Sequence, residues 1–202
     1  MANSTDYPIV AEIEYPQRLS RLSTFFRFLT LIPASILGGL AGIPLLLLTV
    51  LAFLPIVIAK VYPRWMFNLV VALMRFLHQV SAYAFLVTDR FPLAHNPAVR
   101  FEVAYPNRDD LTRVMVFMKW LLVLPHSIVL SILSLLLIPA LVVAWMSVVA
   151  SGRYPRPVFH YLVGLMDWHL RIAAYSQLLI TDAYPPFAFN ELFPGSGRDA
   201  SA

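Results

Sequence analysis

Few side chains in this sequence could take part in chemistry, and most of them lie in two segments, 66–88 and 158–181. Three are histidines, which titrate near neutral pH and commonly bind metals. They are His78 in the first segment and His160 and His169 in the second. Their spacings form neither a His-x-x-x-His pair nor a known histidine–carboxylate cluster. We therefore predict no metal site and no cofactor, and we interpret His126, beside an apolar run, as an ordinary interfacial residue.

Arg75 and Asp167 are the most specific pair of candidates. They are 92 residues apart, and this spacing equals the shift of an internal repeat described below. If the repeats pack about a pseudo-twofold axis, these opposite charges meet across it, and we hypothesise an ion pair between the repeats. The alternative pairs Asp167 with Arg171, four residues further along the same helix.

No catalytic pattern accompanies these residues. The sequence contains no Gly-rich phosphate loop, no Ser-His-Asp pattern and no widely spaced pair of buried carboxylates. It has no cysteine, so it forms neither a disulfide nor a thiolate metal site. We therefore predict a protein that is not an enzyme and has no catalytic residues.

The composition is that of a membrane protein. Hydrophobic residues make up 59% of the 202 residues and charged residues 13%, against about 45–50% and 25% in soluble domains. The net charge of +4 suits contact with anionic lipid head groups. No basic patch of the kind that binds nucleic acid is visible. Acidic residues precede the first apolar run, which is the wrong order for a signal peptide.

The chain repeats itself with a shift of about 92 residues. The same shift places Tyr62-Pro63-Arg64 on Tyr154-Pro155-Arg156, and one further residue places Thr88-Asp89 on Thr181-Asp182. We predict a first repeat with an N-terminal extension over 1–95, a second repeat over 96–190 and a polar tail over 191–202. The structural candidates besides Arg75, Asp167 and Arg171 are the residues of these shared turns: Tyr62, Pro63, Arg64, Tyr154, Pro155, Arg156, Asp89 and Asp182.

The turn motifs also resemble a known family. The second repeat contains Leu124-Pro125-His126, Gly152-Arg153-Tyr154-Pro155-Arg156 and Thr181-Asp182-Ala183-Tyr184-Pro185-Pro186-Phe187. The first contains Tyr15-Pro16-Gln17-Arg18-Leu19-Ser20-Arg21-Leu22 but departs from the pattern at Pro33-Ala34 and Lys60-Val61-Tyr62. In these motifs the chain resembles two tandem copies of the bacterial DUF4389 family, from about Tyr15 to Phe187. The resemblance implies a membrane protein of unknown activity and supplies no catalytic residue.

Each repeat has a long apolar run followed by an amphipathic segment. The runs 28–59 and 120–151 contain no charged residue, and each exceeds the roughly 20 residues that cross a bilayer. In the first run we expect one long helix, or a re-entrant hairpin hinged at Gly38-Gly39; in the second, a single kinked helix. The fold class is therefore an all-α membrane protein, most simply with four membrane helices. If the amphipathic helices instead lie at the interface, two helices cross and the repeats are inverted.

The basic residues suggest an orientation in the membrane. With four crossings, nine Lys and Arg residues lie on the side of the termini and four on the side of the Tyr-Pro-Arg turns. The positive-inside rule then predicts cytoplasmic termini in a multi-pass protein of the bacterial inner membrane. The terminal side includes Arg18, Arg21 and Arg113, and the opposite side includes Lys60 and Arg153.

The segments before each repeat alternate apolar and polar residues. They are 10–15 and 99–105, and alternation is typical of a strand. Two such strands could pair with each other or add to the sheet edge of a partner. We expect a simple extended lead-in and keep the short strands as the alternative.

These features predict a non-catalytic scaffold or accessory subunit of a larger membrane complex. Its expected partners are membrane lipids and other membrane protein subunits, and not nucleic acid. The alternative is a small transporter or lipid-handling protein, with a polar path between the repeats.

Overall fold

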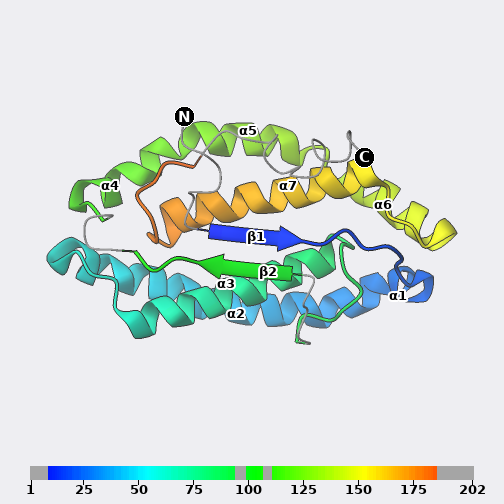
Figure 1. Ribbon diagram of the computed structural model, residues 1–202, viewed down its shortest axis with the longest axis horizontal. Helices are drawn as coiled ribbons and strands as arrows, with labels where there is room; N and C mark the ends of the chain where they lie inside the picture. Colours follow the sequence, from blue (N-terminus) through cyan, green and yellow to red (C-terminus); the bar gives the residue numbers. More distant parts are fainter. Residues whose placement is uncertain (1–8, 94–98, 107–110, 186–202) are drawn as a thin grey trace, which may run out of the picture.

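The computed structural model describes residues 9–93, 99–106 and 111–185. Nearly all of this part of the chain that has regular structure is helical (Figure 1). In chain order the elements are β1 (Ile9–Ile13), α1 (Arg21–Phe25), α2 (Arg27–Ala59), α3 (Arg64–Ala84), β2 (Val99–Val103), α4 (Arg113–Leu122), α5 (Leu124–Ser134), α6 (Leu137–Ser151), α7 (Arg156–Ile172) and the π-helical turn η3 (Ala173–Gln177).

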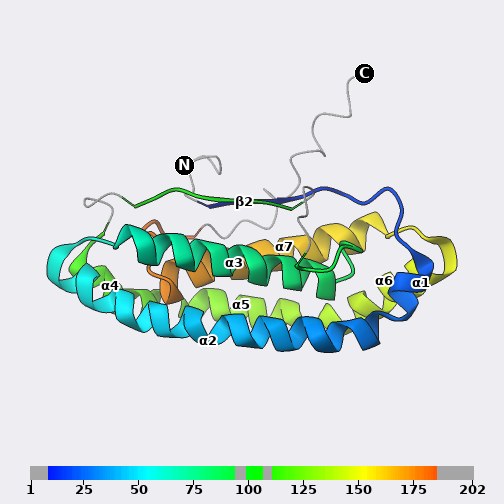
Figure 2. The same ribbon diagram turned by 90° about the horizontal axis from the view of Figure 1, so that it is seen from below.

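The elements form three layers, which Figure 2 shows edge-on. Helix α2 lies in one outer layer with α4, α5 and α6. Helices α3 and α7 form the middle layer, and a ribbon of β1 and β2 covers them on the other side. All of the long elements run roughly along the long axis of the molecule.

The two segments before the repeats are short strands that pair with each other, which confirms the alternative to a simple extended lead-in. They are antiparallel, with Ile9 opposite Val103 and Ile13 opposite Val99. In β2, Val99 and Phe101 are buried while Arg100 and Glu102 are exposed, so the apolar face packs on the middle layer. The helices supply the apolar surface that an isolated two-stranded ribbon lacks, which explains why the strands form.

Helix α2 is continuous over 33 residues although Pro33, Pro44 and Pro55 lie inside it. The predicted hinge at Gly38-Gly39 is absent, so the re-entrant hairpin is wrong. Gly38 instead allows close packing, because a Cβ there would lie 3.3 Å from Cγ1 of Val80 in α3. Contact with α3 therefore holds straight a segment whose composition suggested a bend.

The second apolar run is kinked, as expected, but at two places and not at Pro139 itself. Breaks fall at Val123 and at 135–136. Each break lies close to the carbonyl four residues before a proline, Leu121 for Pro125 and Leu135 for Pro139. Proline has no N–H to donate to that carbonyl, so the helical ladder is weakest there.

The two repeats run in opposite directions along the long axis. Because β1 and β2 each carry the chain along the molecule before a repeat begins, the start of one repeat meets the turn of the other (Figure 1). The Leu19 N–H donates to the Gly152 carbonyl at 3.0 Å, and the Arg113 side chain donates to the Ile58 carbonyl at 2.8 Å. The predicted grouping of Arg113 with Arg18 and Arg21 at one end is therefore wrong.

The outer helical layer exposes its apolar side chains. Almost all of the exposed large hydrophobic residues among the described residues lie at 22–58 or 114–146. Stretches Arg27–Ala59 and Arg113–Ser134 are long and apolar enough to cross a membrane. Only 17% and 22% of their most apolar parts are buried, whereas a core helix of a soluble protein is mostly buried. Length, composition and exposure thus agree on a surface suited to lipid.

Candidate functional site

Two equivalent ion pairs, one per repeat, hold buried cations in the described part of the chain. Nη2 of Arg27 lies 2.8 Å from Oδ1 of Asp89, and Nζ of Lys119 lies 2.7 Å from Oδ1 of Asp182. The side chains of Arg27 and Lys119 are 3% and 0% exposed. Burying an unpaired cation is expensive, so each aspartate is required by the cation next to it. Asp89 and Asp182 were predicted from the repeated turns; Arg27 and Lys119 were not predicted, although they also match at a shift of 92.

Each aspartate also closes a loop of the chain. Its other carboxylate oxygen accepts a backbone N–H at 2.5 Å, from Ser20 for Asp89 and from Thr112 for Asp182. These residues directly precede the helical part of each repeat. The carboxylates therefore join the end of each repeat to its start, and they act as structural clamps within one repeat.

A tyrosine ring covers each cation. Cζ of Arg27 lies 3.9 Å from the ring centre of Tyr83, and Nζ of Lys119 lies 5.2 Å from that of Tyr175. A cation over an aromatic face is attracted by the ring quadrupole, which adds to the stability of the buried charge. Each centre is thus a cation held between a carboxylate and an aromatic ring.

The two centres differ at one neighbouring position. The Tyr83 hydroxyl donates to Oγ1 of Thr30 at 2.7 Å. The residue that matches Thr30 is Leu122, which has no hydroxyl, and the buried Tyr175 hydroxyl has no hydrogen-bond partner. The second repeat therefore lacks one polar contact that the first repeat has.

The Tyr-Pro-Arg turns interlock the two repeats. The Tyr15 hydroxyl donates to the Tyr154 carbonyl, and in the mirror contact the Tyr105 hydroxyl donates to the Tyr62 carbonyl. Arg156 lies over the Tyr15 ring and Arg64 over the Tyr105 ring, at 5.6 and 5.0 Å. Each entry tyrosine is thus bound by the turn of the other repeat.

The prolines of these turns start the inner helices. Pro63 and Pro155 are the N-cap residues of α3 and α7. The tyrosines before them, Tyr62 and Tyr154, are buried, and burial raises the pKa of both phenols. The turn residues selected from the sequence therefore shape the fold, and their partners Tyr15 and Tyr105 complete the contacts.

The ion pair hypothesised between Arg75 and Asp167 is not formed. Nη2 of Arg75 donates to the Phe101 carbonyl in β2 at 3.2 Å, and the ion pairs within 4 Å among the described residues are the two given above. The ribbon lies across the middle layer, and the Arg75 guanidinium binds a backbone carbonyl of the ribbon and not a side chain of α7. Matching positions in the repeats therefore have different partners.

Asp167 is left as a buried carboxyl on α7. It is 6% exposed, and its Oδ1 has no hydrogen-bond partner. Burial raises the pKa of Asp167 to about 7; the Arg171 charge opposes this shift and Glu12 adds to it. The alternative pairing predicted within the helix is not formed either, because Asp167 and Arg171 make no ion pair within 4 Å.

The histidines have separate surroundings. His78 is buried against the Phe101 ring, and burial lowers its pKa to about 4. His126 accepts a hydrogen bond from Nε1 of Trp168 at 3.1 Å. Residues matching His126 and Trp168 in the first repeat are Ala34 and Phe76, so this contact belongs to the second repeat. Within the described ranges, no three histidine or acidic side chains lie close enough to hold a metal ion.

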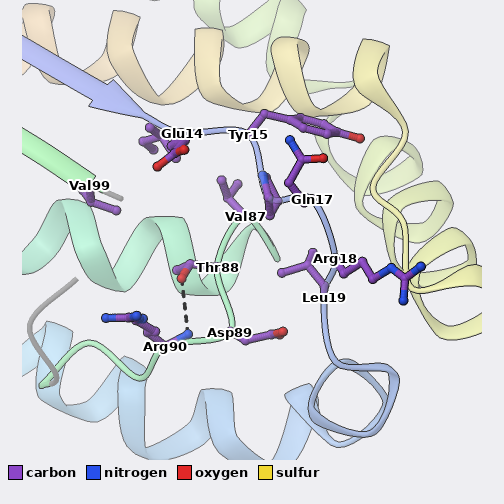
Figure 3. A pocket seen from close by; sticks show the side chains of 12 residues that line it. Glu14, Tyr15, Gln17, Arg18, Leu19, Val87, Thr88, Asp89, Arg90 and Val99 are labelled. Carbon is purple, nitrogen blue, oxygen red and sulfur yellow. Dashed lines mark hydrogen bonds between the residues drawn. The ribbon is translucent and has the colours of Figure 1, made fainter. Parts of the chain in front are cut away.

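A surface hollow of about 320 Å³ lies beside the Asp89 centre (Figure 3). Its walls come from the entry segment 13–19, the turn 87–90 and Val99. In Figure 3 the Thr88 hydroxyl accepts the Arg90 N–H, at 3.2 Å, within the turn itself. The hollow is the junction of three segments of chain.

Together the fold and these centres define a class: a duplicated helical protein whose repeats interlock and whose outer layer is apolar. Residues 21–95 and 113–188 each match the family described as "Domain of unknown function (DUF4389)". The two matches cover most of the chain, and the protein belongs to this family. The resemblance inferred from the turn motifs is thereby confirmed, including its two copies. No curated protein and no solved structure was found to match.

Proposed function

We propose that this protein is embedded in a membrane and acts there as a non-catalytic scaffold or accessory subunit of a larger complex. The observation that supports the proposal is the segregation of side chains. The outer layer exposes apolar residues along its whole length, and its charged residues on α2 and α4 are Arg27 and Lys119, both buried, and Arg113 at the start of α4. An exposed apolar surface of this extent marks contact with lipid or with other proteins.

The interior supports a structural role. The polar groups at the repeat junctions clamp loops of the chain, through Asp89 and Asp182, or join the repeats, through Tyr15 and Tyr105. The ribbon presents charged side chains and two strand edges away from the apolar layer. A partner that adds a strand or a charged surface fits there.

Mild solubilisation of the membranes tests this function. The tagged protein should resist extraction by alkaline carbonate and should migrate in detergent as a complex larger than one chain. A charge-reversed ribbon, Arg100→Glu with Glu102→Arg, keeps the apolar layer intact and should stay in the membrane while losing its partners. A lone monomer in every mild detergent would contradict the scaffold role.

A transporter or lipid-handling role is the second candidate, and the buried Asp167 is the observation that favours it. Ionisable groups at membrane depth often mark transport paths. The hollow described above, however, is lined by the entry segment and the turn and not by α3 or α7. Flux of ions or lipids in proteoliposomes that Asp167→Asn abolishes would support this role over the scaffold.

Four crossings, a bacterial inner membrane and cytoplasmic termini stay predictions. Four crossings would set the long axis of the molecule along the membrane normal.

A further inference from the structure

We infer that the molecule lies with its long axis in the plane of the membrane. In this arrangement the outer layer of α2 with α4–α6 is sunk into one leaflet, α3 and α7 lie at the level of the head groups, and the ribbon is in water. This inference rests on the proposed membrane function and departs from the four-crossing prediction.

The position of the ribbon is the first reason. The ribbon runs parallel to the helices and lies near the middle of the long axis (Figure 1). It exposes Glu12, Arg100 and Glu102, and Glu14, directly after β1, is exposed as well. If the long axis followed the membrane normal, these charged side chains would sit near the bilayer centre, where a charge is strongly unfavourable. Turning the molecule by 90° moves all four into water.

The length of α2 is the second reason. Its 33 residues span about 50 Å at 1.5 Å per residue, and 28–59 contains no charge. The hydrocarbon core is about 30 Å thick, so an upright α2 would have to tilt beyond the usual range of about 0–40°. A helix that lies in the plane has no such mismatch. Its diameter of about 10 Å also fits within one leaflet.

The basic residues are the third reason. Lys60, Arg64 and Arg113 gather at the α2–α3 turn, where Arg113 contacts Ile58. At the opposite end, Arg21 lies beside Gly152, and Arg153 follows directly. A spanning protein usually has an excess of cations on one side, whereas both ends are basic here. In the plane, both ends contact the anionic head groups of the same leaflet.

The absence of natural cysteine makes the test direct. Ala59 and Ser151 are exposed, they end α2 and α6, and they match at a shift of 92. The double variant Ala59→Cys/Ser151→Cys is reconstituted into sealed vesicles of phosphatidylethanolamine and phosphatidylglycerol. One membrane-impermeant maleimide is added outside, and a second of different mass is added after lysis. Intact-mass spectrometry then counts both labels on each molecule.

The inference predicts that each molecule carries two copies of the same label, whichever way it inserted. A molecule that crosses the membrane along its long axis carries one label of each kind, and a majority of mixed molecules would overturn the inference. A cysteine on the ribbon, Glu102→Cys, should carry the same label as Ala59→Cys and Ser151→Cys in the same molecule. Ile43→Cys, in the middle of α2, should stay unlabelled before detergent is added.

Flotation of the same vesicles distinguishes a failure of the in-plane arrangement from a failure of the proposed membrane function. Protein that floats with the vesicles but carries mixed labels retains the membrane function and contradicts only the in-plane arrangement. Protein that does not float, with Ile43→Cys labelled in full, overturns the membrane function and the inference together.

Discussion

The Arg27 centre of the first repeat and the Lys119 centre of the second occupy the same place and use different cations. In both, an aspartate clamps a loop and a tyrosine covers the charge. Lys119 has a further acceptor, the Thr181 carbonyl at 2.7 Å, while Nε and Nη1 of Arg27 have no hydrogen-bond partner. The comparison teaches that the repeat requires a buried positive charge here, and that the surroundings of each copy are fitted to its own cation.

Removing the carboxylates should have the largest effect. Asp182→Ala leaves Lys119 as a buried, unpaired charge, and we expect a loss of about 3–5 kcal/mol in the free energy of unfolding. Asp89→Ala should cost less, because the Asp89 side chain is 28% exposed against 14% for Asp182. Denaturation in detergent measures both. In the control Lys119→Met/Asp182→Leu, much of the stability should return. Equal losses below about 1 kcal/mol would show that neither pair matters.

Asp167, in the second repeat, should make the free energy of unfolding depend on pH, whereas Arg75 at the matching position of the first repeat should not. Its pKa in the folded protein is raised to about 7 from an ordinary value of 3.8. Between these pH values the folded state binds more protons than the unfolded state, so this group's contribution to stability falls as pH rises from about 4 to 7. Asp167→Asn removes that slope and should stabilise the protein by about 1–3 kcal/mol at pH 8.

Thermal unfolding at pH 5 and pH 8 measures this difference. The variant Arg75→Gln alters the matching position of the first repeat, and it should leave the pH slope in place. A slope unchanged in Asp167→Asn would mean that another group causes it.

The entry tyrosines should contribute less and about equally. Tyr15→Phe and Tyr105→Phe each remove one hydroxyl that binds the turn of the other repeat, and each should cost about 0.5–1.5 kcal/mol. If the two contacts lock the repeats as a pair, the loss in the double variant should differ from the sum of the single losses. Strict additivity in a double-mutant cycle would show that the locks are independent.

The smallest expected effect is a gain. Leu122→Thr introduces into the second repeat the hydroxyl that Thr30 provides in the first. It should give the Tyr175 hydroxyl a partner and raise stability by about 0.5–1 kcal/mol. Leu122→Val, which has a similar shape and no hydroxyl, is the matched control. A gain of the same size in both variants would assign the effect to packing.

Much of this architecture could be predicted from the sequence because it depends on periodic apolar residues and on repeated turns. The repeat, the long apolar helices and the importance of Asp89 and Asp182 all followed from patterns local in the chain. The direction of the second repeat was left open between two alternatives, since it depends on β1 pairing with β2 across roughly 90 residues. The partner of Arg75 was missed for the same reason: it is a backbone carbonyl of β2, which no charge pattern reveals.

The one long helix expected in the first apolar run is confirmed as α2, and the alternative hairpin is wrong. Glycine and proline favour a bend in isolation, but at Gly38 helix α3 packs closely against α2. Tertiary contact decided the outcome. The cations Arg27 and Lys119 were overlooked because each stands at the edge of an apolar run, where a basic residue is usually an exposed flank.

In the arrangement inferred above, α2 lies within one leaflet and parallel to the membrane. Depth measurements on spin labels at Leu29, Ile43 and Leu54, all exposed along α2, test it most directly. Each label is introduced through cysteine and compared by its access to oxygen and to a water-soluble nickel reagent. The account predicts equal depths at the three positions. A label at Ile43 that lies roughly 15–20 Å deeper than the other two, as 1.5 Å per residue requires of an upright helix, would contradict it.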